Sequence, residues 1–361
     1  MKKIHWKINK RFVANLITYA LVTAAYIICQ TMMNEGMMSR SLKGQMIPIC
    51  VYIVMAVSLN LTVGISGELS LGHAGFMSVG AFSGIIMSSW LLSAFDMQNT
   101  VLRLILALAT GGVFAGIAGV LIGIPVLRLQ GDYLAIVTLA FGEIIRNVLN
   151  CLYVSVEGRA LHISFNNPQV AGKMILNGPA GATGVGKIAL FSVGFALVIF
   201  TLFVVLNLIN SRSGRAIMAI RDSRIAAESV GINVTKYRMM AFVVSAVLAG
   251  MAGALYGLNY STVTASKFKF DTSILVLVFV VLGGIGNIRG SIIAATLLTV
   301  LPELLRSFSD YRMLVYAIVL ILVMLLTHNP TLKAFFRALR EKLTPRRKKA
   351  AVSARKGGDA K

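Results

Sequence analysis

The feature that most constrains this chain is a succession of long apolar runs, which fill most of its 361 residues. A helix needs roughly 20 consecutive apolar residues to cross the hydrocarbon core of a bilayer, and most of these runs approach that length. Charged residues make up 13% of the sequence, whereas soluble domains contain about 25%. The runs therefore predict an all-α polytopic membrane protein.

Hydropathy and length predict about ten transmembrane helices within a transmembrane domain at residues 12–330. The first run follows five basic residues between Met1 and Arg11. It is too long for the apolar region of a cleaved signal peptide, so we expect a cytoplasmic segment at residues 1–11 and an uncleaved first helix. The predicted spans are 12–33, 45–63, 76–95, 103–127, 133–150, 188–210, 239–260, 273–287, 290–305 and 312–327.

The distribution of Lys and Arg predicts the orientation of these helices. If the spans alternate from an inner N-terminus, 24 of the 35 Lys and Arg lie on the inner side, as the preference of basic loops for the cytoplasm requires. Both termini and a polar segment at 211–238 then lie in the cytoplasm. Residues 152–187, with the turn sequences NNP and NGPAG, become a long external loop.

The last part of the chain, 331–361, contains eleven Lys or Arg and two acids. This composition predicts a disordered cytoplasmic tail that is held near anionic membrane lipid. RNA is the alternative ligand for so basic a tail, but an unpatterned run of like charge is a weak indication of it. We expect no nucleic acid partner.

Two glycine-rich stretches predict helices that are broken inside the membrane. Leu59–Gly84 contains six glycines and Val280–Gly290 contains four. Glycine is disfavoured within regular helices, and unwound backbone is tolerated in a membrane where it lines a cavity or is buried in protein. Together with one acid on a neighbouring helix, these stretches supply the residues expected along a translocation pathway or gate: Gly64, Glu68, Gly72, His73, Glu143, Gly283, Gly284 and Gly286.

The ionisable residues of these stretches admit more than one interpretation. Glu68 and His73 could form a proton relay, but a histidine among small residues is more often a packed structural group, and Glu68 could cap a broken helix. Glu143 and Arg146 are three residues apart and form an opposite-charge pair on one helix face. This pair is either structural or a contact for a solute.

Known catalytic and nucleotide-binding patterns are missing. GATGVGKI at 181–188 has the spacing of a phosphate-binding loop, but Ile188 replaces the Ser or Thr that holds magnesium, and VVLGGIGNIRG misses the dinucleotide fingerprint by one residue. Neither a Ser/His/Asp set nor clustered metal ligands occur. We therefore expect no ATPase or other catalytic site, no metal and no cofactor in this chain.

The polar segment at 211–238 predicts a short amphipathic helix on the cytoplasmic face. Asp222 or Ser223 can cap the start of a helix over Ile225–Val230, Gly231 can end it, and Thr235 can cap the next helix. Such a helix suits a groove in a partner protein. A helix that rests on lipid is the alternative.

Five ordered blocks resemble the permease subunit of bacterial branched-chain amino acid ABC importers. They cover roughly residues 45–327 and read LNLTVGISGELSLGHAGF, LRLQGDYLAIVTLAFGEIIRNV, NGPAGATGV, GRAIMAIRDSRIAAESVGINVTKYRMMAFVVSAVLAGMAGALYG, and VLGGIGNIRG followed by LLTVLPELLR. The resemblance implies a multi-pass protein of the bacterial cytoplasmic (inner) membrane. It further implies three kinds of partner: a second related permease subunit, two cytoplasmic ABC ATPases and an extracytoplasmic substrate-binding protein.

The resemblance also implies an ATPase-coupling loop within the polar segment. IAAESVG is similar to the A-A-x-x-x-G core through which ABC importer permeases engage their ATPases, although Ile225 stands where that pattern has Glu. The distal I-x-L-P part of the pattern is not found at its usual place. The residues of this loop are Arg221, Arg224, Ile225, Ala226, Ala227, Glu228 and Gly231.

The sequence therefore predicts a transport subunit of an ATP-driven importer for branched-chain amino acids, with ATP hydrolysis supplied by its partners. Permeases for urea and short amides are similar, so these solutes are the first alternative. A secondary amino acid transporter that couples ions through Glu68, His73 and Glu143 is the second. An intramembrane enzyme is the third.

Overall fold

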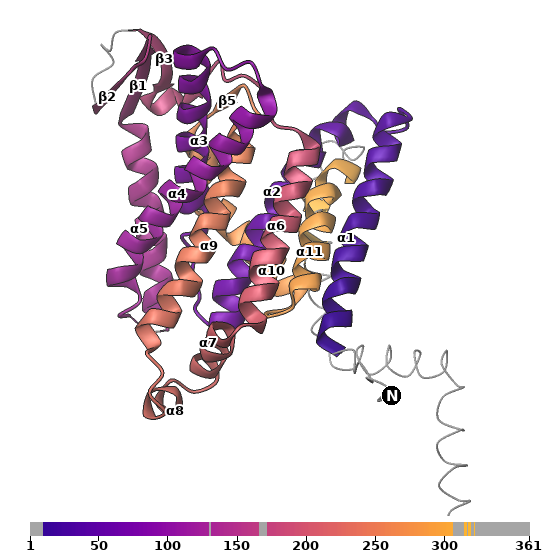
Figure 1. Ribbon diagram of the computed structural model, residues 1–361, viewed down its shortest axis with the longest axis vertical. Helices are drawn as coiled ribbons and strands as arrows, with labels where there is room; N and C mark the ends of the chain where they lie inside the picture. The colour runs from indigo at the N-terminus through magenta and orange to yellow at the C-terminus, as the bar shows by residue number, and fades with distance from the viewer. Residues whose placement is uncertain are drawn as a thin grey trace, which may run out of the picture. The chain divides into compact units, whose positions relative to one another are not determined.

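The computed structural model describes residues 10–129, 131–165 and 172–305, together with residues 314, 315, 317, 318 and 321. The chain divides into two compact units, Met1–Glu303 and Leu304–Lys361. The first unit holds nearly all the described elements and is mostly helical (Figure 1). The predicted tail at 331–361, the segment 1–9 and most of the predicted span 312–327 lie outside the described residues.

Nine of the ten predicted spans coincide with helices of the described part of the chain. Six helices are long and apolar enough to cross a membrane, namely α1, α2 with its extension, α3, α4, α6 and α9, so the predicted count of ten is not confirmed. The helices are α1 (Lys10–Asn34), α2 (Arg40–Asn60), α3 (His73–Phe95), α4 (Thr100–Val126), α5 (Asp132–Asn150), α6 (Phe191–Asn210), α7 (Arg212–Asp222), α8 (Arg224–Ser229), α9 (Val234–Gly257), α10 (Phe270–Gly283) and α11 (Ile288–Leu304).

Helices α3, α4 and α9 pack against one another through small residues. A Cβ atom on Gly253 of α9 would lie 1.9 Å from the carbonyl oxygen of Met77 in α3. A Cβ on Gly80 of α3 would lie 2.0 Å from the carbonyl oxygen of Gly250 in α9. Backbones can approach this closely only where side chains are absent, which is a common way for helices to associate in lipid.

A small antiparallel sheet corrects the all-α prediction. Its strands are β1 (Leu152–Glu157), β2 (Ala160–Phe165), β3 (Lys173–Asn177), β4 (Ala182–Thr183) and β5 (Thr262–Val263), in the order β2-β1-β3-β4-β5. The predicted external loop at 152–187 therefore has a fold of its own. Its first two strands form a hairpin whose two-residue turn begins at Gly158 with φ +59°, as tight hairpins require.

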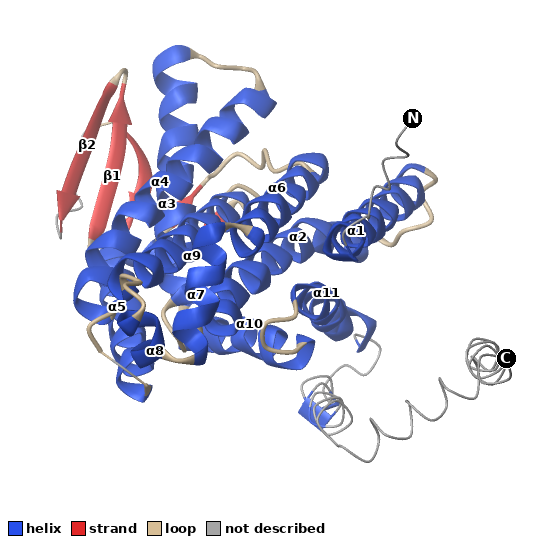
Figure 2. Ribbon diagram, turned by 60° about the horizontal axis from the view of Figure 1, so that its bottom comes forward, coloured by secondary structure: helices blue, strands red, loops and turns tan. Residues whose placement is uncertain are grey.

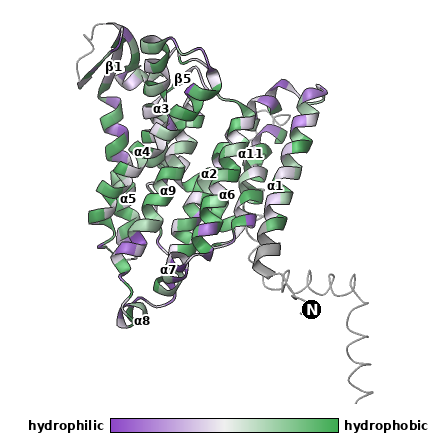
Figure 3. Cartoon of the chain, in the orientation of Figure 1, coloured by the Kyte–Doolittle hydropathy of each residue, from purple (hydrophilic) through white to green (hydrophobic). Residues whose placement is uncertain are grey.

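The sheet and the polar segment lie at opposite ends of the helices. In Figure 1 the strands lie at one end of the helices, above α5, and α7 and α8 lie at the other end. Figure 3 shows mainly hydrophobic residues between these ends and mainly hydrophilic residues in α7. The described residues of 152–187 and those of 211–238 thus lie at opposite ends of the helices, and which end faces the cytoplasm stays a prediction.

The packing at Gly253 predicts a loss of stability on adding a single methyl group. Gly253→Ala would force the backbones of α3 and α9 apart, and overpacking of this kind costs about 1–3 kcal/mol. The unfolding temperature of the purified full-length chain in detergent should fall by several degrees. Gly44→Ala in α2 is the matched control, because nothing lies within 4 Å of a Cβ at that position. Equal unfolding temperatures for the two variants would contradict this packing.

Candidate functional site

The polar segment folds into two short helices at the end of the bundle opposite the sheet (Figure 2). Ser211 caps α7 and Ser223 caps α8, each accepting a hydrogen bond from a backbone N–H three residues later. The predicted cap at Ser223 and the helix end at Gly231, with φ +81°, are confirmed. The predicted cap at Thr235 is wrong, because Asn233 caps α9.

These two helices and the start of α9 share a small hydrophobic core. Ile220, Ala227 and Val234 are buried together, and Ile232 and Tyr237 pack against them. Ala227 was predicted as a coupling residue, but it is only 3% exposed, so it supports the segment from within. The shared core makes 211–238 a folded unit rather than an isolated helix.

The surface of this unit carries two projecting apolar side chains, which we call the α8 tip. Ile225 is 82% exposed and Val230 is 75% exposed. On the same short helix, Nε of Arg224 lies 2.9 Å from Oε1 of Glu228, and Ala226 is exposed. Apolar side chains bordered by charged groups are typical of a protein-binding surface.

Arg221 differs from the residues of the α8 tip because it reaches back into the bundle. Its Nη1 donates a hydrogen bond of 2.9 Å to the carbonyl oxygen of Gly64. Its Nη2 lies 3.0 Å from Oδ1 of Asp222. Its aliphatic part occupies the place of a side chain at Gly67, where a Cβ would lie 2.6 Å from Cγ of Arg221. This arginine therefore joins the polar segment to the first glycine-rich stretch.

The first glycine-rich stretch is broken, as the sequence predicted. Helix α2 continues as a π-helix over Leu61–Ser66, the chain is irregular over 67–72, and α3 begins at His73. Gly67 adopts φ +79°, which favours glycine. A Cβ on Gly72 would lie 2.2 Å from the carbonyl oxygen of Thr138, so this glycine lets the irregular segment pack directly on α5.

The second glycine-rich stretch is broken between α10 and α11 and meets the first. Gly283 ends α10, and Gly284 and Gly286 adopt φ +92° and +81°. A Cβ on Gly64 would lie 2.3 Å from the backbone nitrogen of Gly286. The two predicted discontinuities thus touch through backbone atoms.

Asn60 holds this junction together, and sequence reasoning missed it. The Asn60 side chain is fully buried, its Oδ1 accepts from the Gly286 N–H at 2.8 Å, and its Nδ2 donates to Oγ of Ser291 at 2.8 Å. The signal in the sequence is a single amide within a long apolar run, four residues before Gly64. Such an amide indicates a buried side chain that needs hydrogen-bond partners. A buried polar group without such partners would be strongly unfavourable.

Glu68 pairs with Arg238 of α9 and does not cap a helix. Oε1 of Glu68 lies 2.7 Å from Nε of Arg238, and the two side chains are 5% and 15% exposed. This contact lacks hydrogen-bond geometry, and neither carboxylate oxygen has a hydrogen-bond donor among the described residues.

His73 has a partner of its own, which separates it from Glu68. The His73 ring is buried, and its Nε2 lies 2.8 Å from Oγ of Ser58 in α2. This geometry favours the structural interpretation of His73. It provides no contact between the two groups that the proton-relay interpretation would join.

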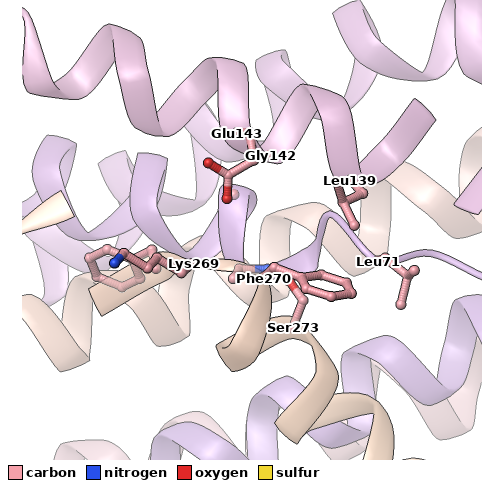
Figure 4. Close-up of a pocket in the computed structure, with 10 residues that line it drawn as sticks. Leu71, Leu139, Gly142, Glu143, Lys269, Phe270 and Ser273 are labelled. Carbon is pink, nitrogen blue, oxygen red and sulfur yellow. Dashed lines mark hydrogen bonds between the residues drawn. The ribbon is translucent and has the colours of Figure 1, made fainter. Parts of the chain in front are cut away.

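Glu143 and Arg146 form the predicted pair on α5. Nε and Nη2 of Arg146 both lie 2.7 Å from Oε2 of Glu143. The pair is partly exposed, and Glu143 lines a small hollow between α3, α5 and α10 (Figure 4). Among the described residues, no group of three His, Cys, Asp or Glu side chains could hold a metal ion.

Comparisons with known proteins agree with the resemblance. Residues 43–324 match the family described as "Branched-chain amino acid transport system / permease component". The chain is 34% identical over 309 residues to the high-affinity branched-chain amino acid transport system permease protein LivM of Salmonella typhimurium, and equally to that of Escherichia coli. This alignment covers 76% of the chain and 66% of each LivM protein, so the chain spans slightly less than two thirds of their length.

A second kind of permease is also similar to this chain. The permease protein LivH of Salmonella typhimurium, from a system of the same name, is 26% identical over 290 residues. That alignment covers 76% of the chain and 88% of LivH. No solved structure matches the chain.

The junction at Asn60 predicts a large effect from one amide. Asn60→Ala removes both hydrogen bonds and leaves the partly buried Gly286 N–H without its acceptor, and a buried group left unsatisfied costs about 1–3 kcal/mol. The unfolding temperature of the full-length protein in detergent should therefore fall clearly. Asn147→Ala on α5, where the side chain is exposed, should change it by no more than about a degree. A similar small change in both variants would refute the role of Asn60.

Proposed function

This chain belongs to the family of permease components of branched-chain amino acid transport systems, and we propose that it is the transmembrane permease subunit of an ATP-driven importer for branched-chain amino acids. The observation that supports coupling to an external energy source is the connection through Arg221. It links α7, which shares a hydrophobic core with α8, to the backbone at Gly64 and Gly67 in the first broken stretch. A surface suited to a partner is thereby joined to a break in the membrane helices.

The proposed assembly contains a second related permease subunit, two cytoplasmic ABC ATPases, an extracytoplasmic substrate-binding protein and membrane lipid. The likeness to both LivM and LivH supports a pair of different permeases. We place the chain in the bacterial inner membrane with both termini and the α8 tip in the cytoplasm, because basic residues concentrate on that side. No nucleic acid has a part in this assembly.

The proposed mechanism converts movement of the ATPases into rearrangement of the helices. When the ATPases close, they displace the coupling loop, of which the α8 tip is the exposed part. Arg221 transmits this displacement to the Gly64 carbonyl, and the contact between Gly64 and Gly286 transmits it to α10 and α11. Such a movement shifts the protein between outward-open and inward-open states only if the ATPases bind the two states with different affinity.

The proposed translocation pathway follows the broken segments and the acid on α5. It comprises Gly64, Glu68, Gly72, His73, Glu143, Gly283, Gly284 and Gly286. Unwound backbone in a membrane is usually found where it lines a cavity or is enclosed by protein. Urea and short amides are the alternative solutes. An ion-coupled mechanism is less well supported, because Glu68 and His73 have separate partners.

The energy source can be tested by uptake. We expect proteoliposomes that contain this chain with its second permease and ATPases, and with the binding protein outside, to accumulate labelled leucine only when ATP is enclosed. Accumulation should persist when a protonophore is added, since no ion gradient drives it. Uptake that requires a proton or sodium gradient and proceeds without ATP would refute the proposal.

The same preparation tests the coupling loop. Ile225→Asp places a charge on the exposed α8 tip and should lower both uptake and the ATPase activity stimulated by the binding protein by at least about tenfold. Met37→Asp is the matched control. The Met37 side chain is also apolar and is 71% exposed, but it lies between α1 and α2, outside the polar segment. This variant should leave both activities nearly unchanged. Normal coupling in Ile225→Asp would exclude the α8 tip as the contact.

A further inference from the structure

Arg103, in the first turn of α4, is a buried charge that has no partner of opposite charge among the described residues. It is 8% exposed, and its Nε is enclosed with no hydrogen-bond acceptor in the part of the chain that the structure describes. The ion pairs found there all involve other basic side chains. A buried charge is costly unless it is paired, so Arg103 requires an anion that these residues do not supply.

Arg103 lies at the end of the bundle that carries the sheet. The end of α3 lies beside the turn of the β1–β2 hairpin, because Nε1 of Trp90 donates to the carbonyl oxygen of Arg159 at 3.0 Å, and α4 begins a short loop later. The loop that follows β4 reaches the same place. A Cβ on Gly186 would lie 4.0 Å from Nη2 of Arg103. Because Gly186 is exposed, the end of the guanidinium lies beside the surface of this loop.

The first turn of α4 adds to the positive potential at Arg103. The free N–H groups at the start of a helix carry a partial positive charge, which favours acids there and disfavours bases. The first turn of α4 contains no acid. Asn99 caps it by accepting a hydrogen bond of 3.2 Å from the N–H of Leu102, but this amide supplies no negative charge. The helix terminus and the guanidinium therefore favour an anion at the same place.

The acid nearest to Arg103 in sequence does not neutralise it. Asp96 lies between α3 and α4, its side chain is exposed, and its Oδ1 accepts a hydrogen bond of 2.8 Å from Nε2 of Gln98. Lys187 follows Gly186 in the loop and is exposed as well. The loop thus contributes a second positive charge rather than a carboxylate.

The direction of Arg103 within α4 favours an anion from water over the phosphate of a lipid. Val101, Leu102 and Ile105 are exposed and form the outer side of this turn, whereas Leu104 is fully buried. Arg103 is buried on the inner side with Leu104, away from the apolar surface that lipid tails would cover. Since so little of the guanidinium is exposed, an anion that pairs with it has to be small.

We propose that Arg103 binds a small monovalent anion, either chloride or a single carboxylate group, beside the start of α4 and the loop at Gly186. The anion neutralises the buried guanidinium and stabilises the packing of this loop against α4. This inference concerns anion binding by the chain itself and does not depend on the proposed function.

The test is the unfolding temperature of the purified full-length protein in detergent at increasing concentrations of sodium chloride. A ligand that binds only the folded state stabilises it, so the unfolding temperature of the wild type should rise by about 2–4 °C once chloride exceeds its dissociation constant roughly tenfold. Arg103→Gln should lack this rise. Arg159→Gln is the matched control, because it removes an exposed charge at the same end, where Cζ of Arg159 lies 5.9 Å from the centre of the Phe95 ring. It should keep the rise.

The NMR signal of chloride measures binding directly and does not depend on how stable a variant is. The wild-type protein should broaden this signal more than Arg103→Gln does, and sodium acetate should reverse the difference by competing for the site. Arg103→Lys keeps the charge and should broaden the signal in part. Displacement by leucine as well would support the site and assign the bound carboxylate to the solute, whereas displacement by acetate alone would support it for a smaller anion.

Two results would overturn the anion site. An equal rise in unfolding temperature for the wild type, Arg103→Gln and Arg159→Gln would show a general effect of salt. Equal broadening of the chloride signal by the wild type and Arg103→Gln, with no displacement by acetate, would show that water alone surrounds the guanidinium. If Arg103→Gln does not fold, the comparison of the wild type with Arg103→Lys decides, and equal broadening without displacement again contradicts the proposal.

Discussion

The hydrogen bond from Arg221 to the Gly64 carbonyl is the interaction on which the functional interpretation depends. Through this bond the folded unit 211–238, which lies outside the predicted apolar spans, contacts the backbone of a broken membrane segment. The π-helix ends two residues beyond Gly64, at Ser66, and the last carbonyl groups of a helix have no donor within it. The arginine supplies one of those carbonyls with a donor and thereby couples the position of α7 to the conformation of the break.

The junction beneath this arginine can exist only because three requirements are met together. Glycine at positions 64 and 286 allows the two backbones to touch, and Asn60 satisfies the backbone N–H that the second break exposes. The buried ion pair of Glu68 and Arg238 fixes the irregular segment to α9. In a low-dielectric interior each of these groups would be costly alone. Small displacements there consequently require concerted rearrangement, which is the property a transport switch needs.

Much of this arrangement could be predicted from sequence, because apolar runs and glycine clusters act locally. The broken stretches, the pair on α5 and the capped helix after Ser223 follow from residue type and spacing. The partner of Glu68 could not be predicted from residue type and spacing, since Arg238 is 170 positions away in sequence and only the fold brings it close. The contact between Arg221 and Gly64 could not be predicted for the same reason, because these residues are also far apart in sequence. The sheet could not be predicted for a different reason. Its strands are only two to six residues long and are flanked by turn residues, so their sequence predicts a loop.

The ratio of solute imported to ATP hydrolysed in Arg221→Ala tests the central claim most directly. The interpretation predicts that the reconstituted complex keeps its ATPase activity while leucine uptake per ATP falls about tenfold, as the loss of one charge-assisted hydrogen bond permits. Arg215→Ala is the matched control on the same helix, because Nη1 of Arg215 donates a hydrogen bond to the carbonyl oxygen of Asn210, five residues earlier in the chain. It should keep the ratio of the wild type. An unchanged ratio in Arg221→Ala would contradict transmission through Gly64.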